Sequence, residues 1–144
     1  MTIKEDCMDQ TVIDKIKASF ARQSYMTTLG AALDHIGKGS VSIRAPMSDH
    51  ILQQHGFAHA GVAFSMGDSA AGYAALTFMP AEAEVLTTEM KINMLAPASG
   101  DVIIAKGRVI KAGRRLTIVG ADVFAITGDQ EKHIAILQGT MISS

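Results

Sequence analysis

The chain has 144 residues, 48% of them hydrophobic and 19% charged, and a formal net charge of -1. This length suits a single core, the near-neutral charge argues against broad nucleic-acid binding, and no uninterrupted apolar run is long enough for a membrane span. Cys7 is the only cysteine and no apolar run opens the sequence, so we expect a cytoplasmic protein without internal disulfides.

The first predicted element is a short amphipathic helix over residues 11–22. Its apolar residues recur at helical spacing, with charged residues on the other side: Val12, Ile13, Ile16 and Phe20. We assign residues 1–24 to an N-terminal segment that contains this helix, and residues 25–144 to the main domain.

Two strands are predicted within residues 25–46, with a turn at 37–39, where two glycines flank a lysine. In the second strand apolar and polar residues alternate, and the apolar ones are Val41, Ile43 and Ala45. We expect residues 47–58 to form a polar, irregular connection. A helix rich in alanine and glycine is predicted to begin at His59 and to stop near Pro80.

From residue 84 onward the sequence alternates with a period of two, which is typical of strands. One face of the first strand is predicted to carry Leu86, Thr88, Met90, Ile92 and Met94. Three further strand-like runs are joined by turns short enough for hairpins: residues 102–110, 116–126 and 134–142. A helix followed by a four-strand meander predicts an α+β fold with an antiparallel sheet. The small helix residues would let this sheet wrap closely around a central helix.

Asp68 is the residue of this helix that most needs an explanation, because a carboxylate is rarely buried unless it is paired or used. Together with Gly61, Ser65 and Gly72 it forms a narrow stripe of small or polar groups on one side of the helix. This stripe would let a ligand or another chain approach the carboxylate. The alternative is structural: Asp68 caps a neighbouring backbone or pairs with a basic residue.

His59 stands where the helix is predicted to begin. A helix N-terminus offers free backbone N–H groups and a partial positive charge, which suit an oxygen that becomes negative during a reaction. Asp68 lies nine residues further on, about 13 Å away along a helix. The two ends therefore either act separately, or a second subunit brings its Asp68 to this helix N-terminus.

The run HAGVAFSMGDSAAGYAAL at residues 59–76 resembles the signature of hotdog-fold acyl-CoA thioesterases. The thioesterases that it resembles are those of the phenylacetate-degradation (PaaI-like) type, which belong to the 4-hydroxybenzoyl-CoA thioesterase superfamily. Its signature is a His-Gly-Gly opening with an acidic residue nine positions after the histidine. The similarity continues through TTEMKINMLAP at residues 87–97 and covers residues 25–141. It implies a hotdog fold, in which an antiparallel sheet wraps a central helix.

The resemblance also implies roles for four residues of the predicted helix start and its stripe. Asp68 matches the catalytic carboxylate, acting as a nucleophile or as a general base on water. Ala60 occupies the position whose backbone N–H polarises the thioester carbonyl, and the Gly61 amide would assist it. His59 would orient that loop or contact the thioester.

Two further residues match supporting positions of the family. Gln53 stands where many relatives have an Asn that positions substrate or water, and Thr87 stands where some relatives have a Ser that hydrogen-bonds the attacking water. The chain departs from the family pattern at two positions. Ala60 replaces the usual first glycine, which keeps the N–H but narrows the approach, and Gln53 has a longer side chain than Asn.

Basic residues gather in the hairpin predicted after residue 102: Lys106, Arg108, Lys111, Arg114 and Arg115. By the resemblance, Lys111, Arg114 and Arg115 would hold the phosphates of coenzyme A; the alternative is an ordinary solvated turn.

The histidines of residues 50–59 do not predict a metal site. The spacing of His50, His55 and His59 is not that of metal ligands, so no metal is predicted.

The sequence therefore predicts an acyl-CoA thioesterase that hydrolyses an acyl- or aryl-CoA ester at a dimer interface. Coenzyme A would be part of the substrate, and no separate cofactor is expected. The partner would be a second copy of the chain, in a homodimer or in a homotetramer of two dimers. Two alternatives remain: a hotdog hydratase or dehydratase, and a non-catalytic acyl-CoA-binding module.

Overall fold

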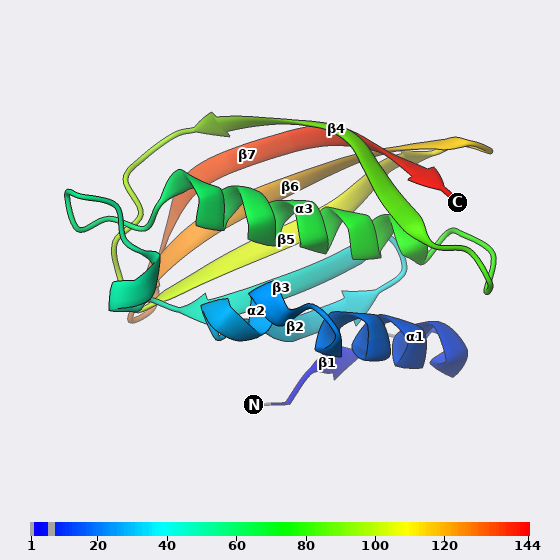
Figure 1. The fold of residues 1–144 in the computed structure, drawn as a ribbon, viewed down its shortest axis with the longest axis horizontal. Helices are drawn as coiled ribbons and strands as arrows, with labels where there is room; N and C mark the ends of the chain where they lie inside the picture. The colour runs from blue at the N-terminus through cyan, green and yellow to red at the C-terminus, as the bar shows by residue number, and fades with distance from the viewer. Residues whose placement is uncertain (1, 6–7) are drawn as a thin grey trace.

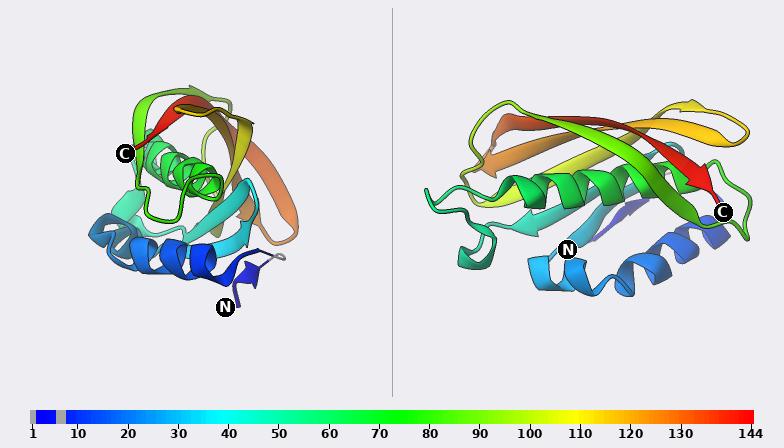
Figure 2. Two further views of the ribbon diagram at one scale, coloured as in Figure 1. Left: turned by 90° about the vertical axis from the view of Figure 1, so that its right-hand side faces the viewer. Right: turned by 45° about the horizontal axis from the view of Figure 1, so that its top comes forward.

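One curved sheet wraps around a long central helix, α3 (Ala60–Leu76), as Figures 1 and 2 show. The computed structural model describes residues 2–5 and 8–144, so Cys7 lies outside the described residues. The predicted α+β architecture, with an antiparallel sheet around a central helix, is confirmed.

The sheet has seven strands in the order β1-β2-β3-β5-β6-β7-β4, and its neighbours are antiparallel except for β1 and β2. The strands are β1 (Lys4–Glu5), β2 (Ala32–Gly37), β3 (Ser40–Pro46), β4 (Val85–Met94), β5 (Val102–Ala112), β6 (Leu116–Thr127) and β7 (Gln130–Ser143). The other helices are α1 (Gln10–Ala21), α2 (Ser24–Leu29) and a 3-10 turn, η1 (Asp49–Ile51).

The sheet is not the simple meander that the sequence pattern predicted. β4 pairs with β7 at one edge, and β5 pairs with β3 and β6. Residues 95–101 carry the chain past the N-terminal end of α3 between these two positions (Figure 1). Periodicity identifies which residues form strands, but it does not determine which strands pair.

The segment before β2 is a helix, which corrects the prediction of a strand there. Met26 and Leu29 are three residues apart and both buried, so they form one side of a short helix. Gly30 ends α2 with a left-handed φ of 68°, a conformation that glycine adopts without steric cost.

The packing of α3 on the sheet depends on small residues. A Cβ added to Gly107 of β5 would lie 2.3 Å from the backbone of Ala70, and one added to Gly67 would lie 2.9 Å from Leu137. The sheet can therefore approach the helix backbone closely, as the alanine-rich sequence predicted. Although α3 is largely apolar, no helix in the described part of the chain is both long and apolar enough to cross a membrane.

A β-bulge in β4 changes the face to which its side chains point. Thr87 pairs with Met141 and Glu89 with Thr140, so Thr88 is the extra residue. The bulge turns Thr87 and Met90 toward α3 and leaves Leu86 54% exposed. The prediction that Leu86 and Met90 share a face was wrong, because an inserted residue shifts the period of two.

Candidate active site

Asp68 lies half-buried on the side of α3 that faces β4. The hydroxyl of Thr87 donates a 2.7 Å hydrogen bond to Oδ1 of Asp68. Among the described residues, no basic side chain forms an ion pair with this carboxylate. The geometry thus offers no support for a structural ion pair at Asp68, and a neutral hydroxyl alone orients the anion.

The start of α3 is capped by its own histidine. Nδ1 of His59 accepts a 2.8 Å hydrogen bond from the backbone N–H of Gly61. A Cβ on residue 61 would lie 3.0 Å from Nδ1, so glycine leaves room for this cap. The Gly61 amide is therefore already engaged. Within residues 2–5 and 8–144, the N–H of Ala60 has no acceptor and remains available to a ligand.

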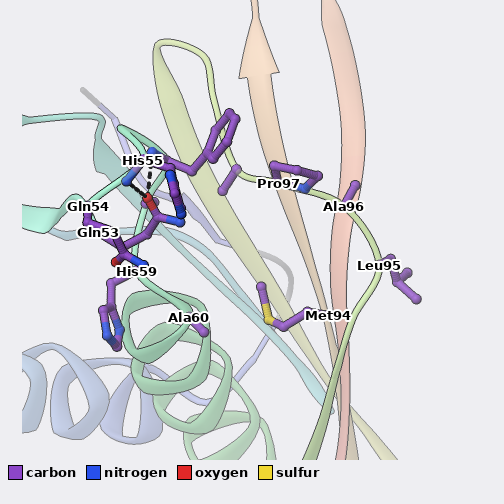
Figure 3. A pocket seen from close by; sticks show the side chains of 12 residues that line it. Gln53, Gln54, His55, His59, Ala60, Met94, Leu95, Ala96 and Pro97 are labelled. Carbon is purple, nitrogen blue, oxygen red and sulfur yellow. Dashed lines mark hydrogen bonds between the residues drawn. The ribbon is translucent and has the colours of Figure 1, made fainter.

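A cavity of about 610 Å³ opens beside this helix start. Ala60 lies on its α3 side, and the opposite side is lined by Met94 at the end of β4 and by Ala96 and Pro97 just after it (Figure 3). The ring of His59 points away from the Met94 segment in this view, as expected for a cap. A carbonyl oxygen entering the cavity would meet the Ala60 N–H at the positive end of the helix dipole.

Gln53 lies in the same cavity, where its side chain closes a local turn. Its Oε1 accepts hydrogen bonds from the N–H groups of His55, at 2.5 Å, and Phe57, at 3.3 Å (Figure 3). In the described part of the chain its Nε2 has no partner. Gln53 therefore keeps an amide donor for substrate or water while its oxygen holds the loop.

Asp68 and Thr87 line a different cavity, of about 260 Å³. The predicted site residues thus form two groups on one chain: His59, Ala60, Gly61 and Gln53 lie at the helix start, and Asp68 and Thr87 lie further along it. Since α3 is a regular helix from Ala60, these groups are about 13 Å apart.

Sequence reasoning missed a polar cluster in the second cavity. The hydroxyl of Tyr73, whose residue is 4% exposed, lies 3.0 Å from Oγ of Ser19 and accepts a 2.7 Å hydrogen bond from Nε2 of Gln23. The cluster joins residues about 50 positions apart, and local periodicity gives no signal for such a contact.

The basic hairpin divides into paired and unpaired residues. Nζ of Lys106 lies 3.4 Å from Oε1 of Glu131, and Nη1 of Arg108 lies 2.5 Å from Oδ2 of Asp122. The other three are exposed, without an ion pair among the described residues: Lys111, Arg114 and Arg115. Both arginines line a cavity of about 570 Å³ at the β5–β6 turn, which lies toward the C-terminal end of α3 (Figure 1).

The sequence model of the thioesterase superfamily matches residues 55–132, more than half of the chain. The chain belongs to the thioesterase superfamily. The matched range holds the start of α3, Asp68 and Thr87, and it leaves Gln53 and α1 outside.

Solved structures place this thioesterase-superfamily chain in the hotdog fold. A thioesterase family protein from Silicibacter pomeroyi is 42% identical with a TM-score of 0.89, covering 92% of this chain and 97% of that one. The E. coli PaaI protein of the phenylacetic acid degradation operon is 19% identical with a TM-score of 0.83, covering 95% and 96%. A Bacillus halodurans protein solved with CoA is 19% identical with a TM-score of 0.75, covering 94% and 87%. The two likenesses at 19% show the fold alone.

Proposed function

We propose that this protein is an acyl-CoA thioesterase that hydrolyses an acyl- or aryl-CoA ester to a free acid and coenzyme A. The observation that carries the proposal is the half-buried carboxylate of Asp68, held by Thr87 and without a basic partner in the described chain, on the central helix of a thioesterase-superfamily member. A carboxylate in this state is free to act as a base or a nucleophile.

The reaction adds water across the thioester. In the first alternative, Asp68 takes a proton from a water molecule while the water oxygen attacks the carbonyl carbon. In the second, the Asp68 carboxylate itself attacks that carbon and forms an anhydride, which water then hydrolyses. The C–S bond breaks, and the electron pair leaves with sulfur as the coenzyme A thiolate. A thiolate is a good leaving group, so the site needs no strong acid beside the sulfur.

The carbonyl oxygen becomes negative during the attack, and the start of α3 would stabilise it. The N–H of Ala60 is free, and the helix dipole adds to its effect. His59 contributes by capping the helix through Gly61. Nε2 of Gln53 would orient substrate or water in the same cavity.

A complete site requires two chains, because Ala60 and Asp68 of one chain are about 12 Å apart along the helix and line separate cavities. In a two-fold symmetric dimer with antiparallel α3 helices, Asp68 of each chain would face the other chain's Ala60. A homodimer is therefore the smallest active unit. A homotetramer of two such dimers would keep every site.

This arrangement also brings the basic hairpin to the substrate. A partner that presents Asp68 to the Ala60 cavity places the C-terminal end of its own α3, and its β5–β6 turn, beyond that cavity. Its Lys111, Arg114 and Arg115 could then bind the coenzyme A phosphates. The B. halodurans protein of the same fold, solved with CoA, supports a CoA-type substrate.

The test is a thiol-release assay on the purified protein with a panel of aryl-, short- and long-chain acyl-CoAs. A thioesterase releases free coenzyme A thiol and acid from at least one of them. A hydratase or dehydratase changes the absorbance of an enoyl group without releasing thiol, and a binding module does neither. Binding without thiol release would overturn the proposal.

A further inference from the structure

The Asp68 cavity is lined in part by a hydrogen-bonded cluster that the proposed hydrolysis does not use. Ser19 at the end of α1 and Gln23 just after it meet the hydroxyl of Tyr73, which lies on α3. Ser69 adds a longer, 3.4 Å hydrogen bond to Oε1 of Gln23. All four residues line the same cavity as Asp68.

Counting hydrogens shows that this cluster has a donor to spare. The hydroxyls of Ser19 and Tyr73 share a single hydrogen bond of 3.0 Å, in which either oxygen can donate. Gln23 donates to Tyr73 and takes no hydrogen from it. Ser19 and Tyr73 together carry two hydroxyl hydrogens, but only one of these is used in the hydrogen bond between them. The hydroxyl that accepts this hydrogen bond therefore keeps its own hydrogen free. Among the described residues, that hydrogen has no further acceptor.

The cavity has the size and the position for the acyl part of a substrate. Its volume of about 260 Å³ lies just below the usual range for small-molecule sites, so it fits a small group. Asp68 lines the cavity, so the reacting carbonyl would lie beside it, and Val85 and Leu76 add apolar atoms to the lining.

We propose that this cavity binds the acyl chain and that the Ser19–Tyr73 pair selects acyl groups ending in a neutral hydrogen-bond acceptor, such as a hydroxyl or a ketone. The inference rests on the proposed hydrolysis of acyl-CoA and adds its acyl specificity. A methyl-ended chain in the cavity would offer the free hydroxyl hydrogen no acceptor, which is unfavourable.

The charge of the cavity excludes a second class of acyl group. Asp68 and Glu84 both line it, and no basic side chain does so in the described part of the chain. A carboxylate at the end of the acyl chain would enter near two like charges without a cation to pair with. We therefore expect dicarboxylic mono-CoA thioesters to be poor substrates.

The experiment compares three acyl-CoAs at each of several chain lengths: ω-hydroxyacyl, methyl-ended with the same number of non-hydrogen atoms, and ω-carboxyacyl. We expect kcat/KM of the wild type to be about 10-fold higher for the hydroxyl-ended than for the methyl-ended member, equivalent to one hydrogen bond. Each single variant, Ser19→Ala and Tyr73→Phe, keeps one free hydroxyl and should retain part of this preference. The double variant should lose it.

The matched control is Ser24→Ala with Tyr25→Phe, which removes the same two hydroxyls from α2, outside the Asp68 cavity. It should leave the preference unchanged. An equal preference in the wild type and the Ser19→Ala/Tyr73→Phe variant would overturn the inference while hydrolysis itself stands. Wild-type protein that hydrolyses none of the thioesters would instead overturn the proposed function. If the double variant does not fold, the single variants decide the same question: a wild-type preference that neither Ser19→Ala nor Tyr73→Phe reduces would overturn the inference.

Discussion

Asp68 and Thr87 form the smallest unit of the proposed chemistry, a carboxylate oriented by one hydroxyl. Replacing Asp68 with Asn keeps its shape and lets Thr87 donate to the amide oxygen, but it removes the charge and the basicity. We expect kcat to fall by about 10²-fold or more, the scale of a lost general base, with little change in KM. Steady-state thiol release by the purified variant measures both constants.

The fold of this variant should survive, because Asp68 is half-buried and has no ion pair in the described chain. Circular dichroism and a thermal melt provide the control. Turnover close to that of the wild type would remove Asp68 from the mechanism.

At this scale the positions of the candidate site residues along the chain could be predicted from the sequence, because the signals are local. His59 and Asp68 share one helix, and their spacing alone placed them at separate positions along it. The hydroxyl pair of Ser19 and Tyr73 was not predicted, since it depends on where α1 packs against α3. The engagement of the Gly61 amide by His59 was also missed, because a ring orientation is not visible in a sequence.

At the scale of the elements, the contact between α3 and β5 should tolerate no added atoms. A methyl group at Gly107 would lie 2.3–2.4 Å from backbone atoms of Ala70 and Ala71, and a helix backbone cannot move aside as a side chain can. We expect Gly107→Ala to lower the free energy of unfolding by about 3 kcal/mol, at the upper end for overpacking. Urea denaturation measures this.

Gly72→Ala is the matched control for that prediction. The added Cβ would lie 3.8 Å from Met141, an ordinary contact, and alanine favours a helix over glycine by about 1 kcal/mol. Gly72→Ala should therefore be as stable as the wild type or more so. Equal stabilities of the two variants would show that the sheet can move away from α3.

The β5–β6 hairpin supports a prediction on substrate binding. Arg114→Ala with Arg115→Ala should raise KM for coenzyme A esters and flatten its dependence on salt, because phosphate contacts are screened by ions. Short thioesters without the nucleotide should be hydrolysed as before. Equal effects on both substrate types would show that the arginines are structural.

The elements themselves were well predicted where the period was strong. The four strands after α3 and the small-residue helix are long segments. α2 was read as a strand because it is only six residues long, too short to show a helical period. The bulge in β4 was missed for a related reason: a single inserted residue leaves the composition of a strand unchanged and shifts only its faces.

At the scale of the whole molecule, the proposed site joins two chains, so two inactive variants should restore each other. Asp68→Ala removes the carboxylate, and Ala60→Pro removes the amide donor. Proline is tolerated at the first position of a helix, and His59 before it is extended, with ψ of 142°, as a residue preceding proline requires.

Mixed and refolded in equal amounts, the two variants form half mixed dimers, each with one site that carries both defects and one that carries neither. We therefore expect activity to recover to about a quarter of wild type, with each intact site keeping its full oxyanion stabilisation. Thiol release before and after mixing measures the recovery. Confirmed mixed dimers without activity, from parents that both fold, would mean that one chain builds the site alone.

The pairing of β4 with β7 also has a consequence for the order in which the chain is synthesised. The ribosome releases β4 early and must add residues 95–129 before β7, its neighbour in the sheet, begins. During that interval β4 presents unpaired backbone groups that another strand can capture, whereas β2 and β3 can pair at once because only a tight turn separates them. We therefore expect the arrival of β7, rather than the formation of α3, to be the step that commits a newly made chain to its native state.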